Sequence, residues 1–150
     1  MEKERRMDDG VLRYIAAVDP GRDKAGLALV RTDGQVVEQL IVPPAEVVER
    51  LRRWQTGYPL AAIVLGDRTG SREFQGVLQA AGLIGSHCPL ALIDEHLSTQ
   101  EARRRYLSTH PGRGLARWLP PSLRVPDRPV DDYVAVILAE RHLAKSSASR

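Results

Sequence analysis

Five short apolar runs along the chain have the length and the flanking turn residues of buried β-strands. They occupy residues 14–18, 26–30, 36–42, 61–65 and 89–93. Asp33 and Gly34, between the second and third runs, are a residue pair typical of a tight β-hairpin. Because short connections join neighbouring antiparallel strands, the first three strands are expected to form an antiparallel meander.

Four further segments carry apolar residues at the spacing of an amphipathic helix. They cover residues 45–54, 71–81, 98–109 and 130–143. Ser71 and Ser98 are expected to cap the second and third of these helices, and Glu101 completes a capping-box pattern with Ser98. Residues 110–129 are rich in proline, glycine and arginine, which predicts irregular structure.

The order of these elements predicts an α/β fold with a mixed five-stranded sheet. A meander followed by strands that alternate with helices requires right-handed crossovers, and these place helices on both faces of the sheet. The predicted domain covers residues 12–144. We expect a disordered, charged leader at residues 1–11 and a disordered, Ser-rich tail at residues 145–150.

Composition and charge narrow the class of protein. The 150 residues are 43% hydrophobic and 27% charged, which suits a single globular core. No apolar run approaches the ~20 residues of a membrane span, and the charged N-terminus lacks a signal-peptide pattern. We therefore expect a cytoplasmic protein with no membrane partner. The single cysteine, Cys88, excludes an internal disulfide and a cysteine zinc cluster. A net charge of +3 permits an anionic partner without requiring one.

Acidic residues stand next to core elements at three places. Asp19 follows the first strand, Asp94 and Glu95 follow the fifth, and Asp131 and Asp132 begin the last helix. If the first and fifth strands are parallel, their carboxyl ends share the sheet edge at which α/β sites form. Converging carboxylates repel one another unless a cation bridges them, and hard oxygen ligands favour Mg²⁺ or Mn²⁺ over Zn²⁺. This pattern predicts a divalent-metal site suited to phosphodiester cleavage.

Each of these features also has a purely structural interpretation. An aspartate at the end of a strand is often a turn former, and one in the first turn of a helix can stabilise the helix dipole. Taken singly, the structural interpretation is favoured, whereas three such junctions together favour a site. Gly21 and Gly26 flank the charged residues Arg22 and Lys24, so we expect the backbone there to approach a phosphate closely.

Three segments carry a specific resemblance to a known family. The segments are VDPGRDKAGLALV, IDEHLSTQEARRRY and PVDDYVAVILAERHL. In this order and spacing they resemble the YqgF/RuvX family of RNase H-fold nucleases, which is related to the RuvC-type Holliday junction resolvases. The resemblance covers nearly the whole predicted domain. It implies an RNase H-like fold and a role in maturing the precursor of small-subunit ribosomal RNA, although resolvase activity has also been proposed for the family.

The resemblance implies a set of catalytic residues. Asp19, Glu95 and Asp131 match the acidic positions of the family and are the implied catalytic residues and ligands of Mg²⁺ or Mn²⁺. Asp132 is one residue from Asp131 and could share its role, and Asp94 is a further candidate ligand.

The sequence departs from the family pattern at two motifs. The arginine that usually follows Asp-Glu is His96 here, which is either a positioned donor or a surface residue. The usual Gly-x-Pro after the fourth strand is replaced by the sequence GDRT at residues 66–69. Asp67 is therefore a fourth acidic candidate at this edge, either as a metal ligand or, as we favour, as a turn residue that caps the loop.

Arginines and hydroxyl side chains near these acids are candidates for binding a nucleic-acid backbone. The predicted contacts are Arg22, Lys24, Thr69, His96, Thr99, Arg103 and Arg104. Aromatic residues are few, so recognition by shape is favoured over base reading. RNA is favoured over DNA on the resemblance alone, with ribosomal precursor particles as implied partners. The chain is expected to be a monomer or a weak homodimer.

Two other function classes remain open from the sequence. An actin-like or sugar-kinase-like ATPase shares this type of sheet but needs a second phosphate loop and a second domain, for which 150 residues leave no room. A non-catalytic RNA-binding ribosome-assembly factor could use the same fold. The acids at all three junctions favour a nuclease over that alternative.

Overall fold

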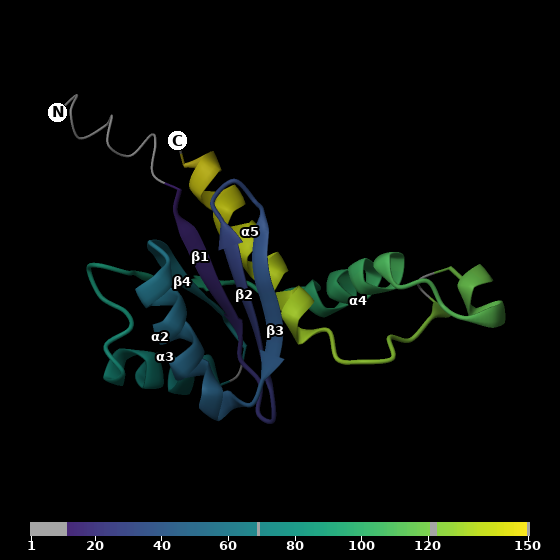
Figure 1. Cartoon of the computed structure of the whole chain (residues 1–150), viewed down its shortest axis with the longest axis horizontal. Coiled ribbons are helices and arrows are strands. Elements are labelled where there is room, and N and C mark those ends of the chain that lie inside the picture. Colours follow the sequence, from purple (N-terminus) through teal and green to yellow (C-terminus); the bar gives the residue numbers. More distant parts are fainter. Residues whose placement is uncertain (1–11, 69, 121–122, 150) are drawn as a thin grey trace.

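The computed structural model describes residues 12–68, 70–120 and 123–149. Its core is an open five-stranded sheet with the order β3-β2-β1-β4-β5 (Figure 1). The strands are β1 (Tyr14–Asp19), β2 (Ala25–Arg31), β3 (Val36–Val42), β4 (Leu60–Gly66) and β5 (Leu90–Ile93). The helices are η1 (Pro44–Glu46), α2 (Val47–Gly57), α3 (Ser71–Ala80), α4 (Ser98–Thr109), η2 (Gly114–Trp118) and α5 (Asp131–Ala148).

The pairing of the strands confirms the predicted α/β fold class. Strand β2 is antiparallel to both β1 and β3, and Gly34 takes the positive φ of 98° that the β2–β3 turn requires. Strand β4 is parallel to both β1 and β5. Consequently β1, β4 and β5 end at the same edge of the sheet, where the sequence placed its first acidic candidates.

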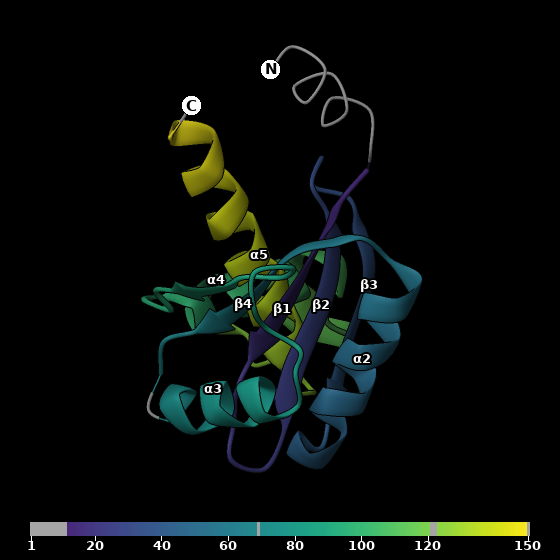
Figure 2. The same ribbon diagram turned by 90° about the vertical axis from the view of Figure 1, so that its left-hand side faces the viewer.

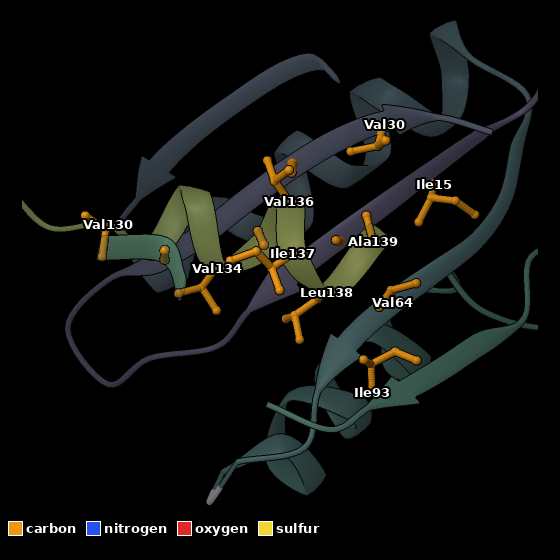
Figure 3. Packing of buried hydrophobic residues seen from close by; sticks show 14 of the residues in the cluster. Ile15, Val30, Val64, Ile93, Val130, Val134, Val136, Ile137, Leu138 and Ala139 are labelled. Carbon is orange, nitrogen blue, oxygen red and sulfur yellow. The ribbon is translucent and has the colours of Figure 1, made fainter. Parts of the chain in front are cut away.

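Helices cover both faces of the sheet, as predicted (Figures 1 and 2). One apolar layer lies between the sheet and helices α2 and α3, and it includes Leu51, Trp54, Leu78 and Cys88. The other layer lies between the sheet and helices α4 and α5 (Figure 3). Helix α5 crosses the sheet and contacts all five strands. No helix in the described ranges is long and apolar enough to span a membrane.

The helix ends differ from the sequence-based expectations. Neither Ser71 nor Ser98 caps its helix, because each is the first helical residue and the preceding residue has a left-handed conformation. The expected capping box at Ser98 is therefore wrong. Helix α5 continues through Ala148 rather than ending at Leu143, and its late serine hydroxyls donate to carbonyls four residues earlier. The expected leader at residues 1–11 lies outside the described residues.

Candidate active site

Asp19 and Glu95 meet at the sheet edge where the parallel strands end. Asp19 is the last residue of β1, and Glu95 lies two residues beyond β5. Both side chains are buried, with 2% and 6% of their residues' surface exposed. Their carboxyl groups are close enough to share a hydrogen bond when one of them carries a proton. Strand β4, which separates β1 from β5, must therefore let the Glu95 side chain cross it.

Glycines on both strands adjacent to β1 make this arrangement possible. Gly66, the last residue of β4, has the carboxyl group of Glu95 in the space that a Cβ atom would fill. Gly26 on β2 pairs with Asp19, and the backbone of Asp131 and Asp132 occupies the position of its missing Cβ. Any larger side chain at either position would displace an acidic segment from the site.

The glycines near the β1–β2 connection are tightly packed by the chain itself. The free face of Gly26 is filled by the start of α5, and that of Gly21 is filled by the carbonyl of Lys24. These glycines therefore allow the chain to pack closely against itself at this connection.

Burial strongly perturbs the acidic pair. The pKa of Asp19 rises to about 9, mainly because burial disfavours its charged form, and the adjacent Glu95 adds to the shift. The pKa of Glu95 is also raised by burial, although the Asp19 hydrogen bond and the Arg68 charge oppose this. Asp19 Oδ1 and Glu95 Oε1 are buried without a hydrogen-bond donor among the described residues, and Glu95 Oε2 has only the ion pair with Arg68. In the absence of a cation, the pair therefore keeps a proton at neutral pH.

Arg68 is a residue at this site that the sequence analysis missed. Its Nε atom lies 2.6 Å from Glu95 Oε2, and its Nη2 donates to Thr99 Oγ1 at 2.6 Å. The guanidinium is about half exposed, so it bridges the buried acid and the surface. A signal was present: Arg68 stands where the family pattern has a proline, in the loop that follows a strand at the site edge.

The two aspartates that begin α5 have different surroundings. Asp132 is 4% exposed and accepts hydrogen bonds from Gln39 Nε2 at 2.9 Å and from Arg128 Nη1 at 3.1 Å. Asp131 is partly exposed, lies 4.0 Å from Lys24 Nζ, and is close enough to Asp19 for its charge to raise the Asp19 pKa. Asp131 is therefore available at the site, whereas Asp132 holds the helix against β3.

Asp67 and Asp94 hold the loops of the same edge. Asp67 Oδ1 accepts from the Glu95 amide at 3.2 Å, and Asp94 Oδ1 accepts from the His96 amide at 2.8 Å. The turn then passes through Leu97 at a φ of 58°, and Ser98 donates its hydroxyl to the Glu95 carbonyl at 2.6 Å. A leucine in the left-handed region is strained, which indicates that the surrounding contacts enforce this turn. These contacts orient Glu95 toward β1.

A basic groove begins beside Asp131. It has a volume of about 250 Å³, and its basic lining residues are Lys24, Arg68, Arg103 and Arg128. Thr99 also lines it, so three of the predicted nucleic-acid contacts (Lys24, Thr99 and Arg103) lie together next to the acids.

The other predicted contacts do not join this groove. Arg22 lines a separate hollow with Pro44 and Phe74. His96 and Arg104 are exposed, and no hydrogen bond of either side chain appears within the described ranges. The neighbouring Arg105, on the same helix, pairs with Glu101 and Glu140. Thr69 lies outside the described residues.

The donor set of the acidic pair fits a hard divalent cation. Within residues 12–68, 70–120 and 123–149, no three His, Cys, Asp or Glu side chains are close enough to form a complete metal cage. Two adjacent carboxylates, with Asp19 Oδ1 and Glu95 Oε1 buried and unpaired among the described residues, nevertheless supply part of an oxygen ligand set of the kind that Mg²⁺ and Mn²⁺ prefer. Asp131 is the nearest further carboxylate.

Comparison with solved structures identifies the fold. Thermus thermophilus RuvC in complex with a Holliday junction substrate matches at a TM-score of 0.54 and 14% identity, over 91% of this chain and 96% of RuvC. Another Thermus thermophilus RuvC structure matches at a TM-score of 0.56 and 15% identity, over 90% and 96%. The chain therefore has a RuvC-like RNase H fold. No family model matches the sequence, and no curated protein matches it.

Proposed function

We propose that the protein is a metal-dependent nuclease that hydrolyses phosphodiester bonds of structured nucleic acid. The observation that carries the proposal is the buried Asp19–Glu95 pair, which Arg68 links to a groove of four basic side chains beside Asp131. Burial of two adjacent carboxylates is unfavourable for stability, and a bound cation would neutralise them and offset this cost.

Asp19, Glu95 and Asp131 would hold one or two Mg²⁺ or Mn²⁺ ions. When bound, such ions supply activation of a water molecule and neutralisation of charge on the leaving oxygen. Asp67, whose Oδ1 accepts from the Glu95 amide, would hold the loop of the site, which is the role favoured for it from the sequence. Asp132 and Asp94, whose side chains are occupied by hydrogen bonds, would shape the site without binding the cation.

The basic groove would hold the nucleic-acid backbone. Lys24 and Arg103 can contact phosphates as exposed cations, and Thr99 fixes the guanidinium of Arg68 beside Glu95. Since the groove has no exposed aromatic side chain among its lining residues, it supports recognition of the backbone and of shape over recognition of bases.

The substrate we favour is the precursor of small-subunit ribosomal RNA, because the motifs around Asp19, Glu95 and Asp131 resemble the YqgF/RuvX family. Ribosomal precursor particles would then be the partners. A four-way DNA junction is the second candidate, because the fold is shared with a RuvC that was solved with such a junction.

The test is cleavage of labelled precursor ribosomal RNA fragments and of four-way DNA junctions, with Mn²⁺, with Mg²⁺ and with chelator. The wild type and Asp19→Asn are compared, with Asp23→Asn as a control on an exposed aspartate of the following loop. Metal-dependent cutting that Asp19→Asn alone abolishes would support the nuclease, and the faster substrate would decide between RNA and DNA. Intact binding without cutting of either substrate would favour a non-catalytic assembly factor.

A further inference from the structure

A second hollow lies beyond the basic groove, between the end of α4 and the segment that returns to α5. It has a volume of about 700 Å³, which is large enough to receive a nucleotide. Its lining includes Tyr106, His110, Arg113, Leu123, Arg124 and Val125. Figure 1 shows that η2, which follows α4, extends well away from the sheet, so this hollow belongs to a projecting arm.

Arg124 forms no ion pair with any described residue that lines this hollow. Its Nε and Nη1 atoms are buried, and they find no acceptor in the described part of the chain. Asp127, the acid that lines the hollow, is already occupied by the hydroxyl of Tyr106. Tyr106 also stacks on His110, and the Arg128 guanidinium lies over its ring. The side of the hollow formed by Tyr106 is therefore fixed by contacts that do not involve Arg124. Two buried guanidinium nitrogens with unused donors are unfavourable, and an anion would satisfy them.

The basic charge of the arm, and the connection of its hollow to the basic groove, indicate which kind of anion binds there. From His110 through Arg128 the sequence has four arginines and one acid, so the arm is strongly basic. Val125 lines both this hollow and the groove beside Asp131, which makes the two hollows neighbours along one path. On the same arm, Trp118 is 76% exposed, with the Arg117 guanidinium 5.4 Å from its ring centre. Exposed aromatic rings among arginines favour a partner that has both phosphates and bases.

We propose that the hollow at Arg124 binds a backbone phosphate of the nucleic acid whose neighbouring segment lies in the basic groove. Arg124 would donate to the phosphate, Arg113 would add charge at the entrance, and Trp118 would offer a stacking surface. The arm is then a second anchor that holds the substrate away from the acids. This proposal rests on the proposed function only in taking nucleic acid as the partner.

The experiment measures binding in the presence of chelator, so that it does not depend on cleavage. Arg124→Met keeps the aliphatic volume of the side chain and removes its charge. Arg72→Met is the matched control, because Arg72 is an exposed arginine on α3, which covers the opposite face of the sheet. Fluorescence anisotropy with a labelled RNA hairpin and a labelled four-way DNA junction is recorded over a series of salt concentrations.

We expect Arg124→Met to weaken binding about tenfold at low salt. The slope of log K against log salt should fall by about 0.7 to 0.9, the change for one lost phosphate contact. Arg72→Met should leave both quantities unchanged. Thermal unfolding separates this role from a structural one: loss of an unpaired buried charge should leave the melting temperature of Arg124→Met equal to or above that of the wild type.

Two outcomes would overturn the proposal. An unchanged salt slope in Arg124→Met, with a lowered melting temperature, would mean that the guanidinium is structural. An unchanged slope together with a wild-type melting temperature that rises in inorganic phosphate would mean that the hollow takes a free anion. The two proposals can fail separately. If the wild type cleaves neither substrate but the salt slope of Arg124→Met falls as expected, the nuclease is refuted and the phosphate-binding role of Arg124 stands.

Discussion

The protonated acidic pair predicts an unusual dependence of stability on pH in the metal-free protein. The pKa of Asp19 is about 9 in the folded state, against 3.8 as its ordinary value. Between these pH values the folded protein holds a proton that the unfolded chain releases. The free energy of unfolding therefore falls as the pH rises, and the contribution of Asp19 is fully present only below its unfolded pKa.

The size of this loss of stability follows from the release of one proton by Asp19. Each pH unit between the two pKa values removes about 1.4 kcal/mol of stability, so raising the pH from about 5 to about 8 removes about 4 kcal/mol. Asn at position 19 is neutral at every pH and can still donate to Glu95. Asp19→Asn should thus match the wild type in acid and exceed it in stability as the pH rises.

The assay is urea unfolding in chelator at several pH values, followed by the fluorescence of Trp54, which is 3% exposed in the core. The difference in unfolding free energy between the wild type and Asp19→Asn isolates residue 19, because the titration of groups that the substitution does not affect cancels. Asp23→Asn, on an exposed aspartate, should remain parallel to the wild type. If the plot of unfolding free energy against pH for Asp19→Asn also runs parallel to that of the wild type, the protonated pair is refuted. Mn²⁺ should stabilise the wild type at neutral pH and have little effect on Asp19→Asn.

Three further substitutions test how the site is assembled. Gly26→Ala should lower the free energy of unfolding by at least about 1 to 3 kcal/mol, because its Cβ would overlap the Asp131 backbone, whereas Gly57→Ala has open space and should be near neutral in the same urea titration. Asp132→Asn should cost about 1 to 3 kcal/mol, because it weakens the buried hydrogen bond from Gln39. Asp131→Asn should change stability by less than about 0.5 kcal/mol and lower Mn²⁺ affinity in calorimetric titrations; the reverse pattern would exchange the roles of the two aspartates.

Much of the fold could be predicted from local sequence. Apolar runs of strand length, the Asp33–Gly34 turn and the helical spacing after Pro44 predicted the sheet and the helices that cover it. These signals are local, because a strand or an amphipathic helix must place its apolar residues at a fixed period to reach the core. The positions of Asp19 and Glu95 at one edge followed from the parallel β1, β4 and β5.

Local sequence could not predict how the helices begin. The serines at positions 71 and 98 have the residue type of an N-cap, yet tertiary contacts place left-handed residues, Gly70 and Leu97, before the helices. Ser98 is fully buried and ties the loop to Glu95 instead of capping α4. The burial of this turn against the site outweighed the weaker preference for a cap.

The sequence by itself determined the order of elements, the sheet edge and the acidic residue types that stand there. Only the tertiary structure decided which of Asp131 and Asp132 faces Asp19, because adjacent residues of a helix point in directions about 100° apart and the packing of α5 sets its rotation. It also decided the roles of Gly26 and Gly66, since the space that each leaves is filled by a segment far away in the chain. Such close approaches depend on how distant elements pack, which no local pattern of residues specifies.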